Sequence, residues 1–258
     1  MFIAQFLTRI RKRRSAISLT KTPANIRAIT EVVRKLAMGE EPAATSADEN
    51  VELVLPIEVN GKHLDLVCPD YGGEQMNDVT EFMEVADNWV ELLKSSDRWV
   101  LFIRPISIVH DYDLSISSYE EISNEKSGTA INPGLSEQSK FIELLQSLLH
   151  VKGVGVRRKV TTPTLLIVLT CWDELGETER PVEVLRDKLP MLLHFAETVW
   201  DKKNIAILGL SSQEFPLNNS KAKERYQDEL PENFGYMVDQ LGNKDKDLTK
   251  VVETALQL

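Results

Sequence analysis

Cysteine is scarce in this chain of 258 residues, and long apolar runs are absent. The two cysteines, Cys68 and Cys171, provide neither a disulfide framework nor the spacing of a metal site. No apolar run reaches the roughly 18 residues that a membrane-spanning helix needs. These absences predict a protein without a membrane span that stays in a reducing compartment, the cytoplasm.

Positive charge is in the minority as well. The chain has 30 Lys and Arg against 40 Asp and Glu, for a net charge of −10. Nucleic-acid phosphates would repel most of such a surface, so we expect no nucleic-acid partner. With 42% hydrophobic and 27% charged residues the composition is that of a globular protein, and the length suits one domain over residues 1–258.

The first 30 residues contain no acidic residue, and residues 9–14 are mostly basic. This composition is typical of a mitochondrial transit peptide. The segment also has an apolar stripe of helical period at Ile3, Phe6, Leu7 and Ile10. Cations in the last turn of such a helix suit its negative end. We therefore expect a packed helix, with a targeting segment as the alternative.

Hydrophobic periodicity divides the rest of the chain into strands and helices. Alternating runs around Asn60-Gly61 predict an antiparallel hairpin over 51–68. Apolar strands and helices then alternate, which predicts an α/β fold with a mostly parallel sheet covered on both faces. The expected strands are 99–103, 164–169 and 205–210. The expected helices are 23–39, 79–94, 141–151, 181–200 and 248–256, and the polar stretch 111–138 is expected to be a flexible insertion.

Residues that suit nucleotide chemistry follow the hairpin. In Pro69-Asp70-Tyr71-Gly72-Gly73-Glu74, the first carboxylate follows a strand and can hold Mg²⁺ through water. The glycine three residues later allows its N–H to approach a terminal phosphate. An ordinary turn rich in Asp and Gly has the same sequence, so this motif alone leaves both interpretations open.

Two further groups follow the expected strands 164–169 and 205–210. In Thr170-Cys171-Trp172-Asp173, the final carboxylate suits the N1–H and N2–H₂ donors of guanine, which adenine lacks as a pair. A helix cap or turn role for Asp173 is the alternative. In Gly209-Leu210-Ser211-Ser212, small residues would let backbone N–H groups meet guanine O6.

The order of the three groups resembles the layout of Ras-like P-loop GTPases. The sequences of these motifs, together with Phe234–Val238 and Asp247–Thr249, most resemble those of the bacterial double-GTPase (DO-GTPase) family, and the resemblance covers most of the chain. The resemblance implies a Ras-like three-layer fold and a switch that binds GTP or GDP with Mg²⁺ and acts on a protein effector. That family occurs in bacterial conflict and signalling gene clusters, which implies a similar setting here.

The resemblance also implies roles at the phosphate end. Thr45 and Asp70 would bind Mg²⁺, Asp70 through water, and Gly73 would sense the γ-phosphate. Glu74 would stand near the attacking water, where a glutamine is usual. Its negative charge beside the γ-phosphate implies hydrolysis that is slow or assisted by a partner.

At the base end the motif departs from the usual one. Thr170 replaces the usual Asn and the next residue replaces the usual Lys, so guanine recognition would rest mainly on Asp173. Ser211 and Ser212 would line the base pocket. Trp172 is expected to be a tryptophan of the core or of the surface, and stacking on the base is the alternative.

The phosphate-binding loop Gly-x-x-x-x-Gly-Lys-Ser/Thr does not occur in the sequence. The resemblance places Met1 about where that loop would end, so the central strand before it would be missing too. About six unpaired backbone positions, at about 1–3 kcal/mol each, rival a total stability of about 5–15 kcal/mol. We therefore expect a start codon assigned too late or a truncated chain, with a loop-less relative as the alternative.

Two other functions stay open. A P-loop ATPase would use Asp173 and Glu174, with Glu174 polarising water, but it would leave Asp70, Gly73 and the two serines unexplained. A nucleotide-free pseudo-GTPase would act as a protein interaction module. Preference for GTP over ATP would separate a GTPase from the P-loop ATPase. Absence of nucleotide binding by the native full-length protein would support the pseudo-GTPase.

Overall fold

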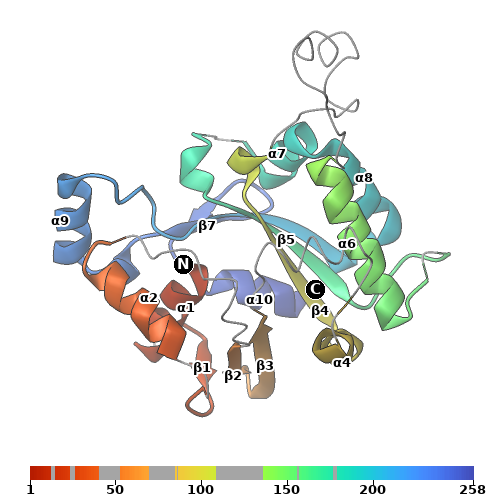
Figure 1. Ribbon diagram of the computed structural model, residues 1–258, viewed down its shortest axis with the longest axis horizontal. Coiled ribbons are helices and arrows are strands. Elements are labelled where there is room, and N and C mark those ends of the chain that lie inside the picture. The colour runs from red at the N-terminus through yellow and green to blue at the C-terminus, as the bar shows by residue number, and fades with distance from the viewer. Residues whose placement is uncertain are drawn as a thin grey trace, which may run out of the picture.

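The computed structural model of the chain describes residues 1–12, 15–23, 27–40, 53–69, 85, 87–108, 136–155, 157–176 and 179–258. These residues form α-helices and two β-sheets (Figure 1). The strands are β1 (Ile17–Leu19), β2 (Leu53–Val59), β3 (Lys62–Cys68), β4 (Arg98–Ile103), β5 (Thr164–Thr170), β6 (Ile205–Ser211), β7 (Tyr236–Val238) and β8 (Lys244–Asp245). The α-helices are α1 (Phe2–Arg11), α2 (Arg27–Ala37), α4 (Asp87–Ser95), α6 (Glu137–Lys152), α7 (Pro181–Lys188), α8 (Pro190–Val199), α9 (Ser220–Glu229) and α10 (Lys250–Gln257).

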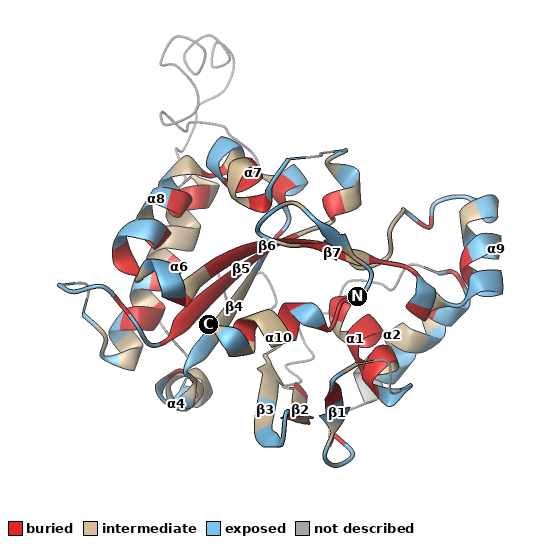
Figure 2. Ribbon diagram, turned by 180° about the vertical axis from the view of Figure 1, so that it is seen from behind, coloured by how far each residue is buried: buried red, intermediate tan, exposed pale blue. Residues whose placement is uncertain are grey.

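The larger sheet has the strand order β4-β5-β6-β7-β8 and is covered on both faces. Alternate residues of β5 point to opposite faces, as in any strand. Leu165, Ile167 and Leu169 pack with α6, α7 and α8, whereas Leu166 and Val168 pack with α1, α10 and the small sheet. Figure 2 shows the buried β5 and β6 between these layers. The α/β class and the covered sheet are therefore confirmed.

The predicted hairpin is confirmed, but it belongs to a separate sheet. Asn60 and Gly61 have φ angles of +50° and +75°, which suit the tight turn that joins β2 to β3. With β1 these strands form an antiparallel sheet of order β1-β2-β3. The outer edges of β3 and β4 pair with no strand among the described residues.

The larger sheet is mixed, and the predicted parallel pairing is present in part of it. Parallel pairing is confined to β4, β5 and β6, whereas β7 and β8 add antiparallel pairs. A short turn accounts for the antiparallel pairing of β8 with β7, and in this turn the Asp239 carboxylate accepts the N–H groups of Leu241 and Asn243, each at 2.8 Å. Such a short turn can only join antiparallel strands.

The helix predicted at 181–200 is two helices. Pro190 is the first residue of α8, where its missing N–H is tolerated, and Leu189 before it has a non-helical φ of −142°. Helix α6 begins at Glu137, earlier than the expected start at 141, because the Ser136 hydroxyl caps it by accepting the Ser139 N–H at 3.3 Å.

Residues 136–138 of the expected insertion are described, and they open α6. Gln138 is fully buried, and its side-chain oxygen accepts the Met191 N–H at 2.8 Å, which ties α6 to the start of α8. The rest of the stretch that we expect to be flexible lies outside the described residues. No helix of the described part of the chain is long and apolar enough to cross a membrane.

Candidate functional site

The carboxyl ends of β4, β5 and β6 meet at one edge of the larger sheet, because these strands are parallel. The register places Thr170 opposite Leu210, one residue before Ser211. Ser212 directly follows β6, and Asp173 lies three residues after the end of β5. Sheet pairing therefore brings the base-end residues predicted from two distant motifs to the same edge.

The end of β5 is tied to the end of β4 by two polar contacts. The Thr170 hydroxyl donates to the Ile103 carbonyl at 3.1 Å. The Arg104 guanidinium donates hydrogen bonds to the Glu174 carboxylate. Its Nη2 lies 2.8 Å from Oε1 and 2.7 Å from Oε2, and its Nε lies 3.2 Å from Oε2. Asp173, which is partly exposed, lies on the turn between these two contacts.

Trp172 belongs to the core, as the first of its two expected roles has it. Cys171 adopts a left-handed φ of +52° and starts a 3₁₀ turn over Trp172–Glu174. The indole is 2% exposed and lies against Gly209 of β6. A Cβ on that glycine would come within 2.5 Å of the indole Cε3, so only glycine allows this contact. The buried indole packs below the turn and holds it against β6.

The turn after β6 is shaped by Ser211. Its side chain is fully buried, and its hydroxyl accepts the Glu214 N–H at 2.8 Å. Gly235, with φ of +91°, packs on the backbone of this turn, where a Cβ would lie 2.9 Å from the Ser211 carbonyl and 2.8 Å from the Ser212 carbonyl. Ser212 is half-buried. That these serines line a base pocket stays a prediction.

Tyr236 is a neighbour of Asp173 that the sequence analysis does not single out. It opens β7 opposite Ser211. Burial raises the pKa of the Tyr236 hydroxyl, and the negative charges of Asp173 and Glu214 raise it further. The Lys244 ammonium lies 4.6 Å from the centre of the Tyr236 ring. A strand of three residues has too little periodicity to reveal this position from sequence.

Helix α1 begins at the same edge of the sheet. The rings of Phe2 and Phe102 lie 5.5 Å apart, which places the start of α1 beside the end of β4. The positive end of the α1 dipole therefore lies beside the end of β4, and such an end favours anions.

The predicted packing of α1 is confirmed, and its polar residues anchor it. Its apolar stripe is buried in the core below the large sheet. The Gln5 amide donates to the Tyr226 hydroxyl at 2.7 Å and to the Pro231 carbonyl at 2.9 Å. Arg9 is 4% exposed and donates to the Phe234 carbonyl at 2.6 Å. The segment after α9 thus fixes the position of α1.

The chain matches the family model of double-GTPase 1 (DO-GTPase1) over residues 1–255. It belongs to the DO-GTPase1 family. Membership identifies a GTPase-like, nucleotide-binding protein and confirms the resemblance drawn from the motifs. No curated protein and no solved structure matches the chain.

The phosphate end of this DO-GTPase1 chain is not described. Thr45, Asp70, Gly73 and Glu74 all lie outside the described residues, so their roles stay predictions. Among the residues that are described, no group of three or more His, Cys, Asp or Glu side chains has the arrangement of a metal site. Of the predicted site residues, the structure therefore describes only Thr170, Asp173, Ser211 and Ser212.

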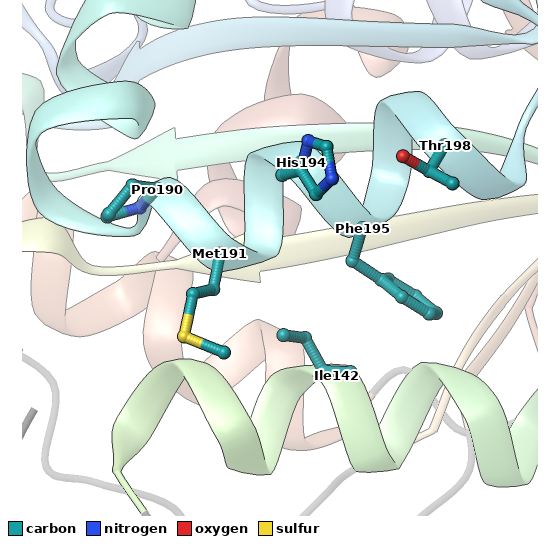
Figure 3. Close-up of a pocket in the computed structure, with 6 residues that line it drawn as sticks. All are labelled: Ile142, Pro190, Met191, His194, Phe195 and Thr198. Atoms are coloured by element: carbon teal, nitrogen blue, oxygen red, sulfur yellow. The ribbon is translucent and has the colours of Figure 1, made fainter. Parts of the chain in front are cut away.

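A cavity of about 460 Å³ lies elsewhere in the DO-GTPase1 chain, between α6 and α8. Figure 3 shows Met191 and Phe195 of α8 pointing toward Ile142 of α6, with His194 and Thr198 on another side of α8. This lining is mostly apolar and includes none of the residues at the ends of β4, β5 and β6. None of its lining residues carries a carboxylate that could bind a guanine base.

Proposed function

We propose that this DO-GTPase1 protein is a guanine-nucleotide-binding switch in which Asp173 reads the base. The observation that carries the proposal is the position of Asp173, on a braced turn at the sheet edge where α1 also begins. A base at Asp173 and phosphates at the start of α1 would occupy one crevice outside the carboxyl ends of parallel strands. Nucleotides in open α/β sheets bind in such crevices.

We further propose a Ras-like arrangement in which one more strand pairs with both β3 and β4. Three observations support it. Neither of these outer edges is paired among the described strands, and Leu64, Leu66 and Val100 from both sheets pack on one shared core. Phe102 of the apolar strand β4 is 42% exposed. A strand that leads into α1 would run parallel to β4, since α1 starts at the carboxyl edge, and would deliver a phosphate-binding loop there.

The phosphate end of the proposed site would consist of the predicted residues. Thr45 and Asp70 would hold Mg²⁺, which neutralises phosphate charge, and Gly73 would sense the γ-phosphate. Glu74 would make hydrolysis slow or dependent on a partner protein. We place this switch in the bacterial cytoplasm, in a conflict or signalling pathway with a protein effector.

The contacts of Glu174 favour this function over a P-loop ATPase. Such an ATPase would need the Glu174 carboxylate to polarise the attacking water. In the described structure both of its oxygens accept hydrogen bonds from Arg104. The side chain therefore contributes to the structure of the turn.

Nucleotide binding by the native full-length protein tests the base-reading role. Asp173→Asn replaces one carboxylate oxygen with an N–H₂ donor, so only one of the two guanine donors keeps an acceptor, and hydrogen bonds to charged groups contribute about 1.5–3 kcal/mol each. GTP affinity should fall about a hundredfold, and xanthosine triphosphate should bind better than GTP, because its 2-oxo group accepts from the Asn amide. Isothermal titration calorimetry with GTP, ATP and xanthosine triphosphate measures both changes.

Asp97→Asn is the matched control for this experiment. Asp97 precedes β4 at the opposite edge of the sheet and its side chain is 65% exposed. This variant should bind GTP like the wild type. Unchanged GTP affinity in Asp173→Asn would refute the base-reading role, and a wild type that binds no nucleotide would support the interaction-module alternative. The intact mass of the native protein tests for a preceding strand and loop. A mass above 29.2 kDa would support them, and a mass of 29.2 kDa would contradict them.

A further inference from the structure

Arg104 and Glu174 form an ion pair between two loops that are 70 residues apart in the sequence. Both guanidinium nitrogens that take part, Nε and Nη2, lie within 3.2 Å of the carboxylate. This forked geometry fixes direction as well as distance, which a single contact would not do. Arg104 directly follows β4, and Glu174 ends the 3₁₀ turn that follows β5.

The pair completes a frame around Asp173. On one side the Thr170 hydroxyl is bonded to the Ile103 carbonyl, and on the other the Glu174 carboxylate is bonded to Arg104. Both contacts reach the end of the same neighbouring strand, β4. The turn that carries Asp173 is therefore fixed at both of its ends, with the Trp172 indole below it.

The pair also changes the charge around Asp173. Asp173 and Glu174 are adjacent carboxylates, and their mutual repulsion would push the two side chains apart. The Arg104 guanidinium neutralises the Glu174 carboxylate. Its hydrogen bonds to Glu174 and the nearby negative charges raise the pKa of Arg104. Asp173 then keeps the only unneutralised carboxylate of the turn.

We propose that Arg104 and Glu174 are positioning residues for guanine selectivity, which they determine through Asp173 without touching the base. The proposal rests on the proposed function, since it requires Asp173 to read guanine. Loss of the pair lets the turn rotate and lets Glu174 compete with Asp173. The alignment of Asp173 with the N1–H and N2–H₂ donors then suffers, whereas contacts to the phosphates do not.

The ratio of inosine triphosphate to GTP dissociation constants isolates this effect. Inosine triphosphate lacks the 2-amino group, so wild-type protein should bind GTP about tenfold more tightly. In Arg104→Gln and in Glu174→Gln this ratio should fall about threefold to fivefold. GTP affinity should fall by at least that factor, because the N1–H contact that both nucleotides make is weakened too. The double variant should be no worse than either single variant, because each one already breaks the pair.

Arg34→Gln is the matched control. Arg34 makes an equally forked pair with Glu31 on α2, with Nε at 3.0 Å and Nη2 at 2.7 Å from the carboxylate, and both side chains are about half exposed. This variant should keep the wild-type ratio. Titrations are done on the native full-length protein, with circular dichroism to verify that each variant is folded.

The outcomes separate the two proposals. Wild-type protein that binds GTP, together with an Arg104→Gln variant that keeps the wild-type ratio, would overturn the positioning role alone. Equal losses of affinity for GTP and inosine triphosphate would also overturn it, since they indicate an effect on phosphate binding or on the fold. Additive effects of the two substitutions would show that the residues act separately. Wild-type protein that binds no GTP would refute the proposed function and, with it, this proposal.

Discussion

A single methyl group on Gly209 should disturb both the stability and the base end of this protein. In Gly209→Ala the new Cβ would lie 2.5 Å from Cε3, 2.7 Å from Cδ2 and 3.0 Å from Cζ3 of Trp172. These atoms belong to a ring that is 2% exposed and packs in the core between the large sheet and α6, α7 and α8. A simple rotation of the indole therefore cannot relieve the clash. Overpacking of this kind costs about 1–3 kcal/mol. Because Asp173 follows Trp172 directly, GTP affinity should fall as well.

Urea unfolding followed by circular dichroism measures the loss of stability. With a slope of about 2–3 kcal/mol per molar urea, the midpoint should fall by about 0.3–1.5 M. Gly155→Ala is the control, since an added Cβ there would meet no atom within 4 Å and its φ is not positive. That change should be neutral or stabilising by up to about 1 kcal/mol.

A second substitution tests the cause. Trp172→Phe alone should be destabilising, but a smaller ring leaves room for the methyl group, so Gly209→Ala with Trp172→Phe should cost less than the sum of the two. The reasoning would be refuted if Gly209→Ala unfolded at the wild-type midpoint. It would also be refuted if the two substitutions were strictly additive.

Two further predictions concern buried groups. Burial raises the pKa of the Cys68 thiol to about 12 and, together with the charge of Glu174, also raises that of Cys171. Less thiolate is then present at neutral pH, so the alkylation rate of native Cys68 should rise about tenfold per pH unit from pH 7 to pH 10. A rate that levels off between pH 9 and pH 10 in mass-spectrometric assays, as for a thiol of ordinary pKa, would contradict this. Arg9→Gln removes a buried donor to the Phe234 carbonyl and should lower the free energy of unfolding in urea by about 2–4 kcal/mol. Arg11→Gln, at an exposed position, should lower it by less than about 0.5 kcal/mol. Equal effects of the two substitutions would contradict the anchoring role of Arg9.

The elements that can be predicted from the sequence are those with a strong local cause. Asn60-Gly61 supplies two positive φ angles, so the hairpin and its register follow from the turn. Strand β5 is continuous in apolar residues because both of its faces are buried. Helix α9 has no such cause: Tyr226 is its one buried side chain, so no apolar stripe marks it.

Part of the candidate site can also be predicted from the sequence. Asp173, Ser211 and Ser212 follow strands, and parallel pairing alone places them at one edge. The partners of these residues come from elsewhere in the chain. The contact between Trp172 and Gly209 and the 70-residue pairing of Arg104 with Glu174 depend on how β4, β5 and β6 align, which no local pattern encodes.

One short segment, residues 231–236, joins the two halves of the proposed site. At its start the Pro231 and Phe234 carbonyls hold Gln5 and Arg9 of α1. At its end Gly235 packs on the carbonyls that follow β6, and Tyr236 lies beside Asp173. The same segment therefore contacts both α1 and the turn after β6, and Gly235 lies too close to that turn for a Cβ to be added.

This connection separates two kinds of variant. Arg9→Gln should lower stability and nucleotide affinity together, because the same carbonyl that anchors α1 fixes the segment next to the base-side turn. Arg104→Gln removes a pair that is half exposed and tied only to the turn after β5, so it should change base selectivity with little change in stability. If both variants changed stability and selectivity in the same proportion, the segment 231–236 and the pair would not be distinct supports of the site.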